Sequence, residues 1–196
     1  MHQFIEYIPV AAQDYCSSLA NNYSFIFNLK NNRLTKLGDF RHDKRSKQFT
    51  ISVNRDLNPF QFLVTYIHEL AHLKVAVDHP GSTKAHGKEW KTAFQELLKP
   101  VLTKDVFPEP LLLVLQKHMI NPKAAAGSDP KLWAALKSYD SITSLPTLDS
   151  VKKGDSFIFR KKGFVKIEKR RTRVLCKEIK SGRLYLIPGI ADVQLE

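Results

Sequence analysis

The central segment of this sequence, residues 58–77, reads NPFQFLVTYIHELAHLKVAV. Asn58 can accept a hydrogen bond from the first turn of a helix, and Pro59 suits the first helical position because it has no backbone N–H. Apolar residues then recur at helical spacing and form a broad face, made of Phe62, Leu63, Tyr66, Ile67, Leu70, Ala71 and Leu73. The sequence therefore predicts an amphipathic helix through about Val77, ended by the breaker His79-Pro80-Gly81-Ser82.

This helix contains the pattern His68-Glu69-Leu70-Ala71-His72. Residues four apart share a helix face, so His68 and His72 can direct both imidazoles at one metal ion. Glu69 lies one residue along, where it can act as a general base toward water. The three fixed positions arise by chance in on the order of one chain in a hundred, but the capped amphipathic helix around them favours a catalytic zinc site.

The third metal ligand is less clearly marked. His86 follows His72 by 14 residues and precedes Gly87, which leaves the approach to a helix start sterically open. Glu89 would be the ligand in a glutamate-type zinc site, and His79 lies closest in sequence, where the helix ends. The spacing favours His86, with Glu89 and His79 as the alternatives.

Other helices and strands are predicted around this motif. Upstream, we expect a helix at residues 9–19 and a small antiparallel sheet with strands at 24–29, 33–40 and 47–54. Asn31-Asn32 tolerates the dihedrals of a tight hairpin turn and is expected to join the first two strands. Downstream, further helices are expected at residues 86–98, 110–119 and 129–139.

The pattern changes after about residue 140. Residues 141–150 are rich in Ser and Thr and are expected to be a linker between a domain at residues 1–140 and a module at residues 151–196. Short β-like segments follow at 156–159, 164–167, 173–176 and 183–187. The sequence predicts an α+β protein whose small β-module has a core of Phe157, Phe159, Val165, Leu175 and Leu186.

Four separate segments carry a family resemblance: LGDFR at residues 37–41, ISVN at 51–54, HELAH at 68–72 and HGKEW at 86–90. In order and spacing they resemble the SprT-like metallopeptidases, a family that includes the Spartan proteases, which digest proteins crosslinked to DNA. The resemblance covers residues 15–99. It implies a minimal zincin fold with zinc bound by His68, His72 and His86, and with Glu69 as the catalytic residue.

The C-terminal part departs from that family. Many SprT-like proteins carry a zinc ribbon built on two Cys-x-x-Cys pairs, whereas Cys16 and Cys176 are the only cysteines of this chain. A single thiolate cannot build such a site, so the β-module is expected to be degenerate and metal-free. Two cysteines so far apart also do not indicate a disulfide framework.

The charge is concentrated in the C-terminal part. Of the net charge of +12, residues 150–196 carry 13 Lys and Arg against 5 Asp and Glu. Such an excess, interleaved with aromatic residues, is typical of surfaces that bind single-stranded nucleic acid. The candidate nucleic-acid-binding residues are Arg160, Lys161, Lys162, Lys166, Lys169, Arg170, Arg171 and Arg173.

Together these features favour a zinc-dependent endopeptidase of the His-Glu-x-x-His type, associated with single-stranded or damaged DNA and acting on DNA-bound or DNA-crosslinked proteins. The alternatives are a general cytosolic metallopeptidase and a non-catalytic nucleic-acid-binding protein with a structural zinc. No apolar run approaches the roughly 18 residues that a membrane-spanning helix needs, and the N-terminus lacks the features of a signal peptide. The expected location is the cytoplasm, with nucleoid association as an extension of the DNA hypothesis.

Overall fold

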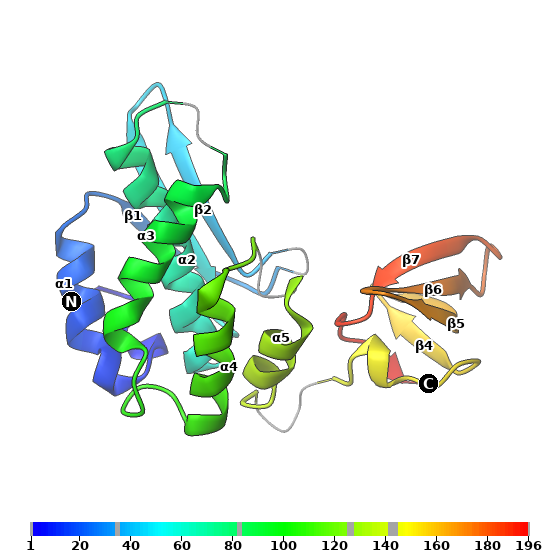
Figure 1. The fold of residues 1–196 in the computed structure, drawn as a ribbon. Coiled ribbons are helices and arrows are strands. Elements are labelled where there is room, and N and C mark those ends of the chain that lie inside the picture. The colour runs from blue at the N-terminus through cyan, green and yellow to red at the C-terminus, as the bar shows by residue number, and fades with distance from the viewer. Residues whose placement is uncertain (1, 34–35, 82–83, 125–127, 141–144, 196) are drawn as a thin grey trace. The chain divides into compact units, whose positions relative to one another are not determined.

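The computed structural model describes residues 2–33, 36–81, 84–124, 128–140 and 145–195 (Figure 1). The chain divides into two compact units, a first unit of Met1–Ala124 and Ala134–Tyr139 and a second unit of Ala125–Trp133 and Asp140–Glu196. Helices and sheets are both present, so the predicted α+β class is confirmed. Within the described ranges, no helix has both the length and the apolar character needed to cross a bilayer.

Helices make up most of the first unit. They are α1 (Gln13–Asn21), α2 (Pro59–Asp78), α3 (Lys88–Leu98) and α4 (Glu109–Ile120), with 3-10 turns η1 (Ile5–Tyr7), η2 (Val10–Ala12) and η3 (Lys99–Val101). The predicted start of α2 is confirmed: Asn58 caps the helix by accepting a hydrogen bond from the Gln61 N–H at 3.0 Å, and Pro59 is its first residue. A further helix, α5 (Pro130–Lys137), crosses the division between the units, and the Asn58 side chain donates to its Leu136 carbonyl at 2.9 Å.

The sheet of the first unit is mixed rather than fully antiparallel. It contains β1 (Ile26–Lys30), β2 (Gly38–Asp43) and β3 (Gln48–Asn54), in the order β1-β3-β2. β1 runs parallel to β3, and β2 runs antiparallel to β3. The prediction of a tight hairpin at Asn31-Asn32 is therefore wrong, because the hairpin joins β2 to β3 instead. Ile51 and Val53 are fully buried, which explains why β3 occupies the centre while the polar β2 lies at an edge.

The second unit contains one antiparallel sheet. Its strands are β4 (Ser156–Phe159), β5 (Lys162–Arg170), β6 (Arg173–Glu178), β7 (Leu184–Pro188) and β8 (Gln194–Leu195), in the order β7-β6-β5-β4-β8. The β4–β5 turn places Arg160 and Lys161 at positive φ, and the β5–β6 turn does the same with Arg171. Four strands therefore form a simple meander along the chain, and β8 returns to pair with β4.

The core of the second unit differs from the predicted one. Phe157 is fully buried as expected, and Phe159 packs against the core, but Leu186 is 46% exposed and Val165 and Leu175 are only half-buried. The other buried positions are Leu148, Val151, Phe164, Val174, Cys176, Ile187 and Val193. Apolar residues occupy both faces of these strands, so the alternation of period two could not indicate which face is buried.

The predicted linker is also partly wrong. Residues 141–144 lie outside the described residues, but those that follow belong to the second unit. There the turn η5 (Leu148–Ser150) forms, Leu148 is fully buried, and the Leu148 N–H donates to the Ala191 carbonyl at 2.8 Å. The apolar side chain of Leu148 thus makes the end of this Ser- and Thr-rich segment part of the core.

Candidate metal centre

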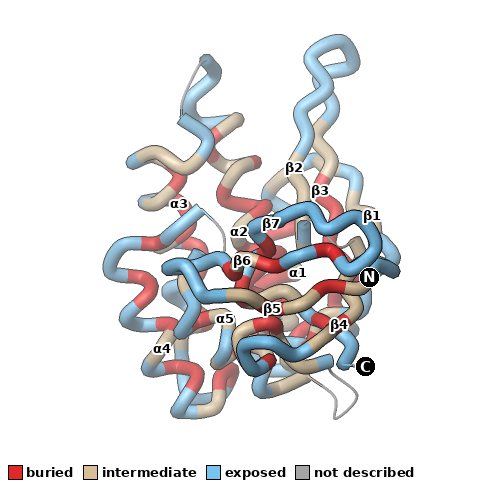
Figure 2. The backbone as a smooth tube through the Cα atoms, turned by 90° about the vertical axis from the view of Figure 1, so that its right-hand side faces the viewer, coloured by how far each residue is buried: buried red, intermediate tan, exposed pale blue. Residues whose placement is uncertain are grey.

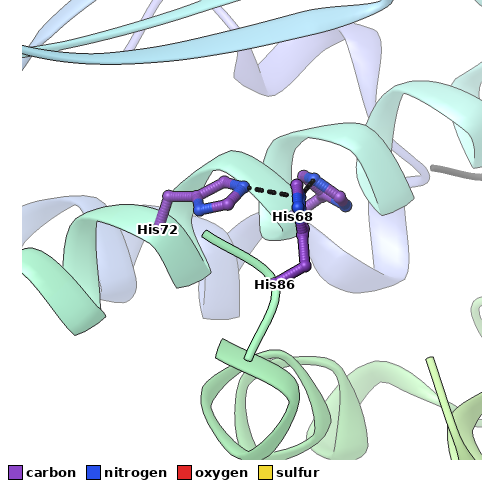
Figure 3. A group of neighbouring side chains, drawn as sticks. All are labelled: His68, His72 and His86. Atoms are coloured by element: carbon purple, nitrogen blue, oxygen red, sulfur yellow. Dashed lines mark hydrogen bonds between the residues drawn. The ribbon is translucent and has the colours of Figure 1, made fainter. Parts of the chain in front are cut away.

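Two histidines of the candidate centre come from α2. His68 and His72 lie four residues apart and therefore on one face of the helix. Figure 3 shows both rings leaving the helix toward the segment that precedes α3. Ile67, Leu70 and Ala71 between and beside them are fully buried. The helix backbone that carries the two imidazoles is therefore fixed by packing.

His86 reaches the same point from the start of α3. Its Nε2 lies 3.1 Å from His72 Nε2 and 3.3 Å from His68 Nε2. One ligand atom from each of the three histidines lies within 4.8 Å of the others, so the group could hold a metal ion. In a tetrahedral zinc site with Zn–N distances of about 2.0–2.1 Å, two nitrogen ligands are about 3.3 Å apart. The spacing in this structure therefore fits a shared ion.

A tight turn directs His86 toward α2. The Gly87 N–H donates to the Lys84 carbonyl at 2.9 Å, and Gly87 is the N-cap residue of α3. A Cβ atom at Gly87 would lie 3.1 Å from Lys84 Cβ and 3.2 Å from the Lys84 carbonyl oxygen. The absence of a side chain thus lets the chain close the turn. Among the described residues, the alternatives Glu89 and His79 are not part of the three-histidine group.

Trp90 packs against all three histidines. Its ring centroid lies 4.6 Å from that of His68, 5.5 Å from that of His72 and 4.7 Å from that of His86. The side chain is fully buried, and its Nε1 donates to the His68 carbonyl at 3.4 Å. Trp90 therefore packs against all three imidazoles and restricts their orientation.

The environment favours neutral imidazoles. Burial, together with smaller effects of His72, His86 and His118, lowers the pKa of His68 to about 3. Burial and then His86 lower the pKa of His72 to about 4, and burial also lowers the pKa of His86. A metal ligand must offer an unprotonated nitrogen. All three histidines are therefore in a form that can bind a cation near neutral pH.

Glu69 is buried between α2 and β2. Gly38 of β2 lies so close that a Cβ atom there would meet Glu69 Oε1 at 2.5 Å and Glu69 Cγ at 2.7 Å. Burial and then the charge of Asp39 raise the pKa of Glu69 to about 8, although Arg33, Lys36 and a hydrogen bond from the Phe40 backbone act in the opposite direction. A buried carboxyl group with a pKa this close to neutrality is typical of a residue that exchanges protons.

The edge strand β2 covers the centre on the side of the sheet. The ring of Phe40 stacks on that of His72, with centroids 6.2 Å apart and an interplanar angle of 13°. The Asn54 N–H donates to the Leu37 carbonyl at 2.9 Å, so the alternation of an antiparallel ladder turns the backbone groups of Gly38, Phe40 and His42 away from β3. The outer edge of β2 therefore faces the side on which Glu69 lies, and the Phe40 N–H on this edge donates to Glu69.

Most of the predicted nucleic-acid-binding residues lie near the two ends of β5. Arg160, Lys161 and Lys162 lie at one end of β5, and Arg170, Arg171 and Arg173 lie at the other end, about 25 Å away at the usual rise of a strand. The structure thus brings together Arg160, Lys161 and Lys162 as one group. It brings together Arg170, Arg171 and Arg173 as another.

Several of these cations are already engaged. Lys162 pairs with Glu178 at 2.8 Å, Lys169 pairs with Asp149 at 2.9 Å, and Arg170 pairs with Glu168 at 2.7 Å. Lys166 is buried, and its Nζ donates to the carbonyls of Leu148, Asp149 and Val151 at 2.9, 3.2 and 2.7 Å. Lys166 is therefore not available to a phosphate group, which corrects its place among the candidates.

Three residues of the centre were not assigned a role from the sequence: Gly38, Phe40 and Trp90. Gly38 and Phe40 lie two residues apart in a strand, and a glycine in a strand often marks a close approach of the backbone to a neighbouring element. Trp90 lies in the first turn of α3, four residues after His86. These spacings become informative only when α2 is known to lie against both elements.

Comparisons of the chain with protein-family models, with curated proteins and with solved structures find no match.

Proposed function

We propose that this chain is a zinc-dependent endopeptidase. The observation that supports the proposal is the convergence of three imidazole nitrogens, together with the buried carboxyl group of Glu69, which follows His68 in α2. Three nitrogen ligands leave a fourth position for water or substrate, which is the arrangement of catalytic zinc sites, whereas structural sites fill all four positions with protein ligands. A purely structural site would also have no use for Glu69.

The residues around the centre have distinct roles in the proposed reaction. A zinc ion bound by the three histidines would supply Lewis-acid polarisation of the scissile carbonyl and would acidify a water molecule. Glu69 takes the proton from the attacking water and returns it to the leaving amine.

The edge of β2 offers a place for the substrate backbone. An extended peptide can add to an unpaired strand edge through main-chain hydrogen bonds, which select for an extended conformation rather than for a sequence. The proposal therefore expects cleavage within unfolded or locally extended segments of protein substrates.

The more specific part of the proposal concerns the substrates and the location. We expect the substrates to be DNA-bound proteins and the location to be cytoplasmic or nucleoid-associated. This part is supported by the charge excess of residues 150–196, by exposed cations such as Lys161 and Arg171, and by the resemblance to SprT-like proteases. DNA would also provide the control that a protease with an open site requires. A general metallopeptidase and a non-catalytic DNA-binding protein with a structural zinc are the alternatives.

The test is proteolysis of a basic DNA-binding protein by the zinc-loaded chain, with and without single-stranded DNA, with Glu69→Gln as the control. Cleavage that needs Glu69 and is stimulated by DNA is the expected result. Cleavage that is indifferent to DNA would leave a general metallopeptidase. No cleavage under any condition, with zinc and DNA both bound, would favour the non-catalytic alternative.

A further inference from the structure

The tip of the hairpin between β2 and β3 carries three exposed cations. Lys44, Arg45 and Lys47 are exposed, and none of them has a carboxylate partner among the residues that the structure describes. Figure 2 shows this hairpin tip in the colour of exposed residues. Residues 43–47 hold these three cations against the single carboxylate of Asp43, so the turn has a net charge of +2.

The engagement of the two acidic residues of β2 is specific. Asp43 Oδ1 accepts from the backbone N–H of Arg45 at 2.8 Å and so closes the turn. Asp39 forms ion pairs with Lys36 at 2.7 Å and with Arg41 at 3.0 Å. Both acids therefore shape the hairpin, and its tip keeps a net positive charge.

A row of aromatic rings connects this tip to the metal centre. Phe40 stacks on His72, and Phe49 follows with its centroid 5.9 Å from that of Phe40. His42 comes next, 4.6 Å from Phe49. Since Phe40 faces Ile51 and His42 faces Phe49 across the ladder, all of these side chains lie on the same face of the sheet. Phe40 and Phe49 are half-buried and His42 is exposed, so the row opens to solvent toward the tip.

The hairpin is also the basic cluster with a defined position relative to the metal ligands, because both belong to the first unit. Lys44 lies four residues beyond Phe40, which is about 13 Å along the strand. By contrast, most of the candidate cations of the second unit lie near the two ends of β5, and Lys162, Lys169 and Arg170 are held in ion pairs.

We infer that the β2–β3 hairpin binds a single-stranded nucleic acid, with Lys44, Arg45 and Lys47 contacting phosphates and the rings of His42 and Phe49 stacking on bases. A basic surface next to exposed aromatic rings binds single strands without sequence preference because every base has a π-face. An acidic peptide would use the cations but would gain nothing from the rings. In a peptidase, and here the inference rests on the proposed function, this contact places the strand beside the site of cleavage.

Binding can be tested without any cleavage. The affinity of the full-length, metal-free chain for a fluorescent 20-nucleotide oligo(dT) is measured by anisotropy over a range of salt concentrations. The triple variant Lys44→Gln, Arg45→Gln, Lys47→Gln should bind at least about tenfold more weakly, and its log-log salt slope should fall by about 2. The matched control loses the same charge at Lys99, Lys104 and Lys117, far along the chain in η3 and α4 and the segment between them, and should keep most of the affinity and the slope.

The role of the rings is tested with an oligonucleotide that has abasic sites at its centre. The parent chain should lose about tenfold in affinity for this strand, while the variant His42→Ala, Phe49→Leu should show no difference between the two strands. Zinc binding by each variant reports whether the first unit is folded.

Equal affinity and equal salt slope for the two triple variants would overturn the inference. Displacement of oligo(dT) by poly-glutamate of the same charge, with no effect of the abasic sites, would overturn it in favour of an acidic-peptide surface. Failure of the chain to cleave any protein would refute the proposed peptidase but would leave this binding result intact.

Discussion

The two units differ in the environment of their buried ionisable groups. In the first unit, Glu69 is buried against Gly38, and its environment raises its pKa to about 8. In the second unit, the Lys166 ammonium donates to three carbonyls, and the Glu178 carboxylate is bonded by Lys162, Ser181 and Tyr185. The first unit thus buries a carboxyl group whose pKa lies near neutrality, whereas the second unit holds its buried lysine and its buried glutamate with several hydrogen bonds each.

This difference distinguishes buried groups that can take part in a reaction from buried groups that stabilise the fold. A buried group whose environment shifts its pKa toward neutrality is a candidate for proton transfer, whereas a fully hydrogen-bonded buried group fixes the fold. Substitutions in the first unit should therefore change activity or metal affinity at nearly constant stability. Substitutions at the buried charges of the second unit should change stability without affecting the metal centre.

The largest expected effect on stability concerns Lys166. Lys166→Met leaves the carbonyls of Leu148, Asp149 and Val151 without their donor, so the free energy of unfolding of the second unit should fall by roughly 2–4 kcal/mol. Zinc affinity should not change. Urea unfolding followed by circular dichroism measures the effect, and Lys169→Met in the same strand is the control, with an expected loss below about 1 kcal/mol because its ion pair with Asp149 is exposed. Equal losses in the two variants would mean that the three carbonyl bonds do not anchor η5.

Gly38→Ala should have the largest effect on activity outside Glu69 and the ligands. The new Cβ atom would overlap Glu69 Oε1 and Thr65 Cγ2, at 2.5 and 2.8 Å, and would displace the carboxylate. A displacement of about 1 Å of a catalytic group costs about a hundredfold in rate. Steady-state kinetics on a peptide substrate, together with the zinc content of the variant, checks the prediction. Full activity in Gly38→Ala would show that the position of Glu69 against β2 is not required.

A smaller effect is expected for Trp90→Phe. Phenylalanine keeps an aromatic ring behind the histidines but loses the hydrogen bond to the His68 carbonyl, so zinc affinity should fall by about tenfold. Competition with a chelator gives the affinity, and Trp133→Phe is the matched control. If both variants bound zinc equally well, Trp90 would be a packing residue with no influence on the ligands.

The smallest expected effect is the acid response of the second unit. Hydrogen bonds from Lys162 and then Ser181 lower the pKa of Glu178. A carboxylate whose folded-state pKa is depressed contributes stability above its unfolded pKa of about 4.3, and this contribution is lost as the pH falls through the folded-state pKa. The unfolding temperature of the second unit should therefore fall at acidic pH more steeply in the parent chain than in Glu178→Gln. Parallel pH profiles would contradict this assignment.

The sequence predicted the parts of the fold that local chemistry determines. The cap at Asn58 and Pro59 and the helical spacing of apolar residues defined α2, because each signal lies within a few residues of its effect. The order β1-β3-β2 could not be predicted, since strand pairing depends on contacts between residues distant in sequence. The core of the second unit was assigned to Val165, Leu175 and Leu186, which lie on its outer face, because both faces of those strands are apolar.

The same limit applies to the candidate centre. The i, i+4 spacing of His68 and His72 is a property of one helix and was visible in the sequence. The contact of Glu69 with Gly38, and of Trp90 with three histidines, depends on how α2 packs against β2 and α3. The burial of Lys166 could not be predicted either, because a lysine in a basic run is usually exposed. Its burial is favourable only because the carbonyls of Leu148, Asp149 and Val151 accept its hydrogen bonds.

The most direct test of the central claim compares the rate of cleavage of an unfolded protein by the parent chain and by Glu69→Gln at equal zinc content. The account predicts one zinc ion per chain in both proteins and a rate lower by about 10²–10⁴ in the variant, because only the proton acceptor has been removed. Equal rates with equal zinc content would contradict the assignment of Glu69 as the general base, and with it the proposed mechanism.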